Sequence, residues 1–357
     1  MSLPLQDQLC AIVNQSDVAD ASVTGEMIVL ARRHRVHLLV AERGAVKELA
    51  AERRAAVALE ALREAELRRV LAALSGADVR AVLFKGAAIA RTHYRSPELR
   101  VRSDTDMLVP AARSEDAARV LESLGYRRAV ETDGALIVSQ FHCEVVDRAQ
   151  VAHALDVHWR ISNAIAFADL VSYDEIVQDA IALPGLGPHA LGPCNTHSLL
   201  LACLHRIAHH PDSADLLWLY DLHLLVERLT HDEQRRFAQL AGERRVRAVC
   251  AYSLQDAFAA FGGRAADLAA RIAPPMDIVE PTSAFLAPRR RPVDMLTADL
   301  RALDRWPQRL QLLREHVFPG REYMFARYGT RRSSSLPWLY VRRLVSGAPK
   351  WFRWDDD

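Results

Sequence analysis

The residues best suited to chemistry lie between Leu83 and Val109. Within this stretch, the triplet Asp104-Thr-Asp106 is followed by apolar residues, as in a strand that carries acidic side chains at one end. Residues two apart in a strand project from the same face, so the two carboxylates are expected side by side. They repel each other unless a cation lies between them, and a hard divalent cation with oxygen ligands suits that place. The triplet therefore predicts a Mg²⁺ site.

A third carboxylate follows in Ala154-Leu-Asp156-Val-His158-Trp-Arg160. Alternation places Asp156, His158 and Arg160 on one face of a second strand. If the two strands are neighbours, three carboxylates converge on one or two Mg²⁺ ions. Such ions activate an incoming hydroxyl and stabilise a pyrophosphate leaving group, which is the chemistry of nucleotidyl transfer. Asp156 is also a candidate base. His158 is expected either to act on the acceptor or to hold a ligand by a hydrogen bond.

A candidate phosphate site precedes the acidic triplet. Lys85-Gly86 ends an apolar strand and opens a helix, where glycine allows close backbone approach and the helix N-terminus favours an anion. Only three of the 46 basic residues are lysines, so a lysine here is unusual for this chain. Arg100 and Arg102, with Ser103 beside them, are candidates to bind a triphosphate, although either arginine would also serve to balance the carboxylates.

The sequence around these residues alternates between strand-like and helical patterns. A helical region that ends near residue 76 is followed by a strand at 79–84, a strand at 105–109 and a helix at 111–124. Further β-type segments are expected at 126–131, 135–141, 144–146 and 154–159. A Gly/Pro-rich connector spans 183–193, and helices follow at 196–210, 216–229 and 232–261. The pattern predicts an α+β protein with an N-terminal helical region (1–78), a small mixed-sheet core (79–182) and a C-terminal helical region with a basic aromatic tail (183–357).

The motifs resemble the uncharacterised nucleotidyltransferase family of the DNA polymerase β-like nucleotidyltransferase superfamily. The residues that carry the resemblance are Lys85-Gly86, Arg100, Asp104-Thr-Asp106 and Asp156-Val-His158-Trp159. It extends to the helices around 200–229 and to motifs between 318 and 340, so it covers most of the chain. It implies a mixed sheet flanked by helices, metal binding by Asp104, Asp106 and Asp156, and an NTP donor. The superfamily usually has Gly-Ser or Gly-Gly at the first turn. Here Ala87 follows Gly86, so Lys85 is expected to replace the missing hydroxyl contact to phosphate.

Composition limits the classes of protein that fit. The chain has 357 residues, 46 Lys+Arg against 45 Asp+Glu, and is half apolar, as expected of a protein with a large core. Five scattered cysteines favour reduced thiols, and neither a signal sequence nor a membrane span is evident, so a cytoplasmic location is expected. Residues 287–354 carry 15 basic and 5 acidic side chains, so the near-neutral total combines an acidic body with a basic tail.

Two further features admit alternatives. His205 and His209 lie four apart on a predicted helix, and we expect them to make buried polar contacts, Asp221 being a candidate partner, rather than bind zinc. The tail combines arginines with Trp338, Tyr340, Trp351, Phe352 and Trp354. It is expected either to bind RNA by phosphate contacts and stacking, or, as we favour, to pack its aromatics onto the body and its arginines against acidic residues.

The sequence therefore predicts a cytoplasmic, Mg²⁺-dependent nucleotidyltransferase. The acceptor is expected to be a small molecule or a peptide, since no RNA-binding module is recognisable. A toxin-like enzyme that modifies tRNA through the basic tail is the rival enzymatic hypothesis, and a non-catalytic nucleotide-binding or scaffolding protein is the rival from another class.

Overall fold

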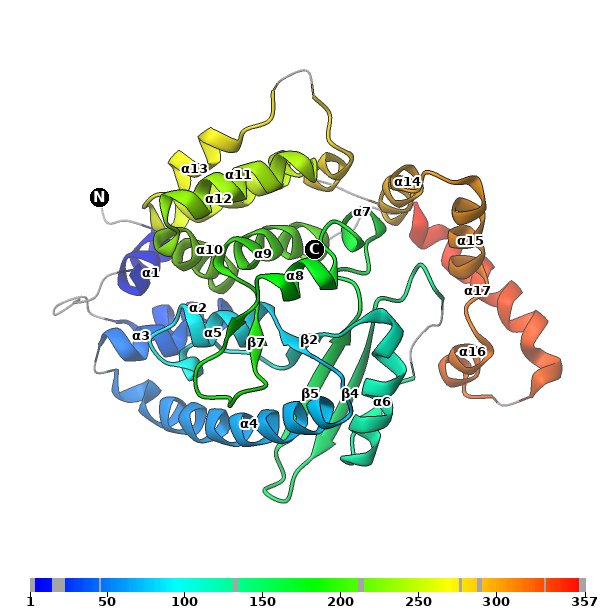
Figure 1. Ribbon diagram of the computed structural model, residues 1–357, viewed down its shortest axis with the longest axis horizontal. Coiled ribbons are helices and arrows are strands. Elements are labelled where there is room, and N and C mark those ends of the chain that lie inside the picture. Colours follow the sequence, from blue (N-terminus) through cyan, green and yellow to red (C-terminus); the bar gives the residue numbers. More distant parts are fainter. Residues whose placement is uncertain are drawn as a thin grey trace.

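A mixed β-sheet lies at the centre of the computed structural model, which describes residues 4–14, 23–44, 46–130, 134–210, 215–275, 278–287, 291–330 and 332–352 (Figure 1). Across the described residues the strand order is β3-β4-β5-β2-β1-β7-β6. The strands are β1 (Val82–Leu83), β2 (Thr105–Leu108), β3 (Arg127–Arg128), β4 (Gln140–Val146), β5 (Ala152–His158), β6 (Ile181–Ala182) and β7 (Leu191–Gly192). The α+β class predicted from the sequence is confirmed.

The sheet brings together the strands that carry the acidic motifs. β2 runs parallel to β5 and antiparallel to β1. In the β2–β5 register, Asp106 lies directly opposite Asp156, and Met107 opposite Val157. Met107 and Val157 are fully buried, and they fix the register because a shift by one residue would turn apolar side chains to the opposite face.

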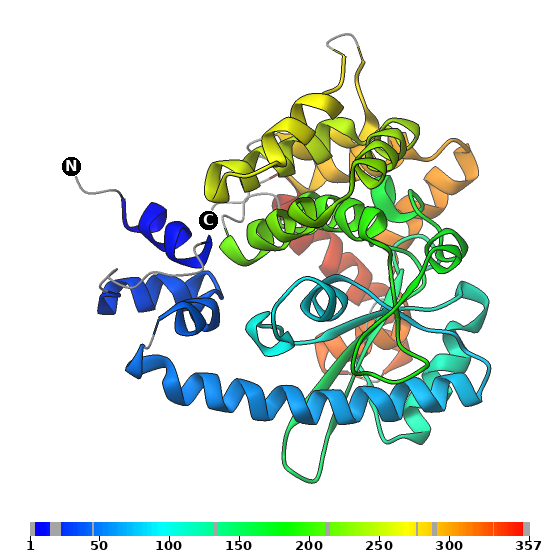
Figure 2. The same cartoon turned by 60° about the vertical axis from the view of Figure 1, so that its left-hand side comes forward.

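Helices cover the sheet on both sides. The long helix α4 (Ala50–Gly76) lies along one side and packs Leu67, Val70, Leu71 and Leu74 into a core shared with the strands. On the opposite side lie α9 (Asn195–His209), α10 (Leu216–Arg228), α11 (His231–Glu243), α12 (Arg247–Phe261) and α13 (Ala265–Ile272), as Figures 1 and 2 both show. These helices share a second core with α1 (Leu5–Asn14), α2 (Gly25–Arg33) and α3 (His37–Arg43).

Shorter helices connect these layers. They are α5 (Lys85–Thr92), α6 (Ser114–Ser123), α7 (Ile165–Ala168) and α8 (Tyr173–Gln178), with 3₁₀ turns at Lys47–Leu49, Pro97–Leu99, Ala111–Arg113, Pro281–Leu286 and Ser333–Ser335. The predicted helix at 111–124 is thus confirmed as a 3₁₀ turn that leads into α6.

Two strand predictions are wrong in detail. The segments expected at 135–141 and 144–146 form one strand, β4, because residues 140–146 pair continuously with β5. The Gly/Pro-rich connector also contributes to the sheet: Val82 of β1 pairs in parallel with Leu191 of β7. Strands of two residues are too short to show a hydrophobic period, so only pairing with a neighbour reveals them.

The basic tail forms four helices: α14 (Pro292–Ala302), α15 (Trp306–Val317), α16 (Arg321–Tyr328) and α17 (Leu336–Trp351). The tail contacts the body partly through acidic side chains that accept hydrogen bonds from its backbone. Glu315 accepts from the Leu136 and Ile137 amides at 2.9 and 3.2 Å, and Asp299 accepts from the Ala166 amide at 3.0 Å.

The predicted packing of the tail is wrong in two respects. Trp338 and Phe352 are more than 60% exposed, so these aromatics do not pack onto the body. Among the described residues, no ion pair joins a tail arginine to an acidic residue of the body; Arg291 instead pairs with Asp294 inside the tail. The physical reason is that aliphatic side chains, not aromatic ones, form the buried cluster between tail and body. Trp354 and four of the arginines, Arg289, Arg290, Arg331 and Arg353, lie outside the described residues.

Two predictions from composition are met. All five cysteines are free thiols. Within the described residues, every helix is too short or too polar to cross a membrane.

Candidate active site

Lys85, Asp106 and His158 form a hydrogen-bonded group beside Asp156. The Lys85 ammonium lies 2.7 Å from Asp106 Oδ1, and His158 Nε2 lies 3.0 Å from the same oxygen. Asp106 and Asp156 are direct neighbours across β2 and β5. Three segments distant in sequence therefore bring two carboxylates, an ammonium and an imidazole together at one point of the sheet.

The backbone at Lys85 is strained in a way that serves this arrangement. Its φ of 51° lies in the left-handed region, where a non-glycine residue costs about 1–3 kcal/mol. Lys85 is the first residue of α5 and follows the short strand β1 by one residue. The chain turns sharply there, and the ammonium reaches Asp106 on the adjacent strand.

Two side chains of the neighbouring strand β4 contact the Asp156 carboxylate. His142 Nδ1 lies 2.6 Å from Asp156 Oδ1, and Gln140 Nε2 donates to Oδ2 at 3.5 Å. His142 and Asp156 face each other in the β4–β5 register. The sequence analysis did not select His142 or Gln140, because β4 was expected as two separate segments.

Asp104 lies in the bend just before β2 and accepts a hydrogen bond from the Ser103 hydroxyl at 3.3 Å. Burial, together with the charges of Asp106 and Asp156, raises the pKa of Asp104, while Lys85 opposes that rise. The three carboxylates predicted from the sequence are thus close enough to repel one another. This is the electrostatic environment that a divalent cation relieves.

The pKa values of Asp106 and His158 are both lowered, for different reasons. Burial by itself would raise the Asp106 pKa, but Lys85 and His158 together hold it well below its usual range. Burial and the Lys85 charge lower the pKa of His158, which favours the neutral ring at pH 7. A neutral ring that holds Asp106 through Nε2 carries its proton there, and Nδ1 is buried with no hydrogen-bond partner.

Arg100 pairs with Asp221 of α10, on the helical side of the molecule. Its guanidinium contacts the Asp221 carboxylate at 2.6–3.2 Å and donates to the Val101 carbonyl at 2.9 Å. The Tyr94 hydroxyl donates to the same carboxylate at 2.7 Å. Gly86 makes room for this group, because a Cβ at that position would lie 3.0 Å from Arg100 Nη1. The glycine thus allows close approach of an arginine side chain.

The two other arginines singled out from the sequence also have acidic partners. Arg102 pairs with Glu60 of α4 at 2.8 Å, and both side chains are buried. Arg160 pairs with Asp169 at 2.6 Å. In the described part of the chain, Arg102 lines the cavity beside the carboxylates, whereas Arg160 and the buried His158 do not.

A cavity of about 460 Å³ opens between the acidic strands and the helices above them. Its sheet side carries Lys85, Asp104, Asp106 and Asp156. Its helical side carries His205, Arg206, His209 and His210 from the end of α9 and the residue after it, together with Trp218 of α10. The volume lies within the range of small-molecule sites, about 300–1,000 Å³.

The histidines of the helical side differ from prediction in their partners. His209 Nε2 lies 3.0 Å from the Ser162 hydroxyl, and the rings of His205 and His209 lie with their centroids 5.1 Å apart and their planes tilted by 41°. Asp221 is not their partner, since Arg100 and Tyr94 occupy it. Burial, with the Lys85 charge as the second cause, lowers the pKa of His209 to about 4.

Arg206 is the cavity residue that sequence reasoning missed. Its Nη2 donates to Asp256 at 2.5 Å, while Nε and Nη1 are buried without a hydrogen-bond partner. Leaving buried donors unpaired is costly, so Arg206 is a candidate anion-binding residue, although its two unpartnered nitrogens are themselves closed off from solvent. The one sequence signal was its place beside His205 and His209 on one predicted helix.

The residues present fit a magnesium ion. The Asp106, Asp156 and His158 side chains each offer one ligand atom within 4.8 Å of the others, and Asp104 adds a third carboxylate to the same cavity. The carboxylate oxygens of Asp104, Asp106 and Asp156 suit Mg²⁺, which takes carboxylates and substrate phosphates. Burial and the charges of Asp106 and Asp156 raise the pKa of Asp104, in keeping with this crowding of carboxylates.

A mixed sheet whose strands β2 and β5 present paired carboxylates to a polar cavity beneath a helical layer suits the transfer of phosphorus-containing groups. The model of a family described as uncharacterised nucleotidyltransferase matches residues 23–262, which include β1 to β7 and helices α2 to α12. The chain belongs to this nucleotidyltransferase family, as its motifs suggested. No curated protein matches the chain.

Proposed function

We propose that this chain is a cytoplasmic, Mg²⁺-dependent enzyme that transfers a nucleoside monophosphate from an NTP to a hydroxyl or other nucleophile of a small molecule or peptide. The observation that carries the proposal is the β2–β5 register, which sets Asp106 directly opposite Asp156 beside Lys85. We assign metal binding to Asp104, Asp106 and Asp156. A bound Mg²⁺ would supply positive charge for the attacking and leaving oxygens.

The chain's own residues have separate tasks in this proposal. His158 is a positioning residue, since it is buried behind the cavity and holds Asp106 Oδ1. Asp156 accepts the proton of the acceptor hydroxyl, and His142 orients its carboxylate through Oδ1. Lys85 brings a compact positive charge to the phosphates from the start of α5.

Arg206 is the residue that we assign to the triphosphate. Three arginines of the cavity each have an acidic partner: Asp221 for Arg100, Glu60 for Arg102 and Asp256 for Arg206. Arg206 has two N–H donors free of protein partners and lines the cavity opposite the carboxylates. The nucleotide would thus extend from the sheet side of the cavity to α9.

A transfer assay tests the proposal. The wild-type chain is incubated with each α-³²P-labelled NTP, Mg²⁺ and fractions of cell extract, beside the Asp104→Ala/Asp106→Ala variant. Asp232→Ala, which removes an exposed carboxylate at the start of α11, is the matched control. We expect label in small molecules or peptides with the wild type and the control, and none with the double variant.

The other outcomes distinguish the rival functions. Label in RNA would identify a tRNA-modifying enzyme and would refute the proposed acceptor class. The ion pair between Lys85 and Asp106 favours the second candidate, a protein that binds a nucleotide without transferring it, because a cation already neutralises one of the carboxylates. Nucleotide binding without transfer, equal in wild type and double variant, would refute the enzymatic proposal.

A further inference from the structure

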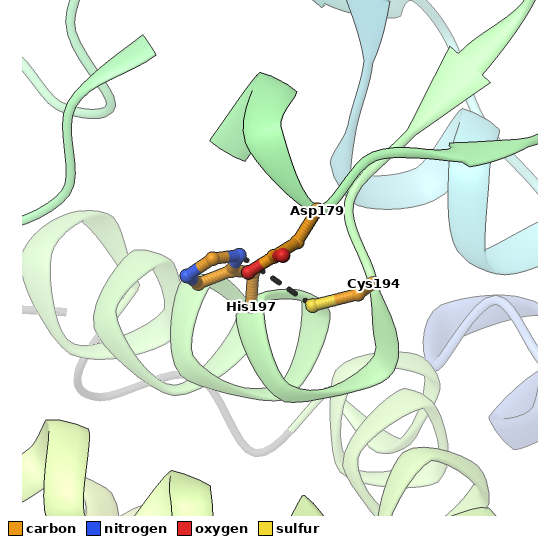
Figure 3. A group of neighbouring side chains, drawn as sticks. All are labelled: Asp179, Cys194 and His197. Atoms are coloured by element: carbon orange, nitrogen blue, oxygen red, sulfur yellow. Dashed lines mark hydrogen bonds between the residues drawn. The ribbon is translucent and has the colours of Figure 1, made fainter. Parts of the chain in front are cut away.

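A second group of metal-binding side chains lies where the sheet edge meets the helical layer. Asp179 follows the end of α8, Cys194 immediately precedes α9, and His197 lies in the first turn of α9 (Figure 3). One ligand atom of each residue lies within 4.8 Å of the others. Figure 3 shows the carboxylate, the thiol and the imidazole facing one another. The two helices at whose ends they lie, α8 and α9, supply none of the carboxylates grouped on β2 and β5.

The separation of the sulfur and the nitrogen fits a zinc ion. Cys194 Sγ lies 3.5 Å from His197 Nδ1. In tetrahedral zinc sites Zn–S is about 2.3 Å and Zn–N about 2.0–2.1 Å, which places the two ligand atoms about 3.5 Å apart at the tetrahedral angle. The two ligands also have the short sequence separation typical of zinc-binding pairs, since two residues stand between Cys194 and His197.

The far side of the imidazole faces a carboxylate. His197 is completely buried, and its Nε2 lies 3.5 Å from Glu175 Oε1 of α8, close to that carboxylate but not hydrogen-bonded to it. Zinc-bound histidines typically direct their second nitrogen to a carboxylate, which fixes the ring and raises its basicity as a ligand. Glu175 is held in turn by Arg244, at 2.9 Å.

Asp179 is able to serve as the third ligand while keeping its present partner. Arg236 Nη2 donates to Asp179 Oδ2. A carboxylate has two oxygens with about four acceptor sites, so one oxygen can bind a metal while Arg236 holds the other. Arg236 also balances part of the negative charge that a thiolate and a carboxylate bring to a divalent ion.

We propose that Asp179, Cys194 and His197 bind one Zn²⁺ ion, with water as the fourth ligand and Glu175 orienting His197. The ion would join the end of α8 to the start of α9. Because α9 also carries His205, Arg206 and His209 to the cavity, this junction fixes the helical wall of the active site. The inference stands independently of the proposed function.

Metal analysis of the full-length chain tests the proposal. Purified protein is loaded with Zn²⁺ or Co²⁺, freed of excess metal, and examined by elemental analysis and by the absorption band of a cobalt–thiolate bond. The band reports only a site with a sulfur ligand, so metal at Asp106 and Asp156 does not contribute to it. We expect this band in the wild type and in Cys203→Ala, which removes a buried thiol from the same helix outside the group.

Two variants are expected to differ from that control, each in its own way. Cys194→Ser is expected to abolish the cobalt–thiolate band and the thermal stabilisation that Zn²⁺ gives the wild type. Glu175→Gln is expected to keep the band but to weaken zinc binding by about 10–100-fold, as removal of an orienting carboxylate does elsewhere. A wild-type chain without the band, or a band that persists in Cys194→Ser, would overturn the proposal whether or not nucleotidyl transfer is found.

Discussion

The buried ion pair between Arg100 and Asp221 allows a quantitative test of what holds the cavity in shape. The two side chains are 7% and 4% exposed. The substitution Asp221→Asn removes the negative charge but leaves nearly the same volume. Because the Arg100 guanidinium then stays buried without a balancing charge, we expect the free energy of unfolding to fall by about 3–5 kcal/mol.

Urea denaturation followed by circular dichroism measures this change. Glu52→Gln is the control, since Glu52 pairs with Arg32 at the surface, with side chains 37% and 45% exposed, and an exposed pair contributes at most about 1 kcal/mol. The double variant Arg100→Met/Asp221→Leu is expected to recover much of the stability that Asp221→Asn loses, because it leaves no unpaired charge.

The same variants separate a structural role of Arg100 from the triphosphate role expected from the sequence. If Arg100 acts through Asp221 alone, the double variant keeps the wild-type Kd for NTP within about twofold. A loss of less than about 1 kcal/mol in Asp221→Asn would refute the argument from burial. A selective loss of nucleotide affinity in a stable double variant would restore the triphosphate role.

Three further predictions concern single side chains. Lys85→Arg is expected to reduce turnover by about 10-fold or more, because a planar guanidinium does not replace a compact ammonium in this tight turn. Full turnover in this variant would show that the rarity of lysine in the chain says nothing about the role of Lys85. Arg206→Gln is expected to raise the KM for NTP by about 10-fold with little change in kcat. Asp256→Asn removes only the charge of its protein partner and is expected to leave KM near the wild-type value. Equal KM values for all three proteins would contradict the assignment. Burial raises the pKa of Asp299 to about 6, so its contribution to stability is full below about pH 4 and is lost as pH rises through 6. The stability of the wild type relative to Asp299→Asn should therefore fall by up to about 3 kcal/mol between pH 4 and pH 7 in urea titrations, and a constant difference would refute the assigned cause.

Local sequence was enough to predict the elements that carry the chemistry. Apolar residues alternate along β5 and form a continuous run at the end of β2, and both strands lie within two residues of the predicted segments. The helical layer was equally predictable, because long runs of helix-forming residues leave few alternatives. The residues of the cavity wall could not be predicted, because nothing in the local sequence shows that Arg206 lies opposite the carboxylates.

Tertiary contacts also decided what each charged residue does. Arg100, Arg102 and Arg206 are chemically equal in the sequence. Asp221, Glu60 and Asp256 pair with them in turn, and within the described residues Arg206 has two donor nitrogens without a hydrogen-bond partner where Arg102 has one. Those partners lie between 42 and 121 residues away, beyond the reach of any local pattern.

The sequence by itself determined that the chain is an α+β nucleotidyltransferase with an acidic pair, a lysine turn and a second acidic strand, because residue types and strand periodicity are local properties. Only the tertiary structure decided that Asp106 faces Asp156, that Lys85 and His158 share one of its oxygens, and that α9 closes the cavity. The physical reason is that burial and pairing, which set the charge and the free donors of each group, depend on neighbours that the chain supplies from distant segments.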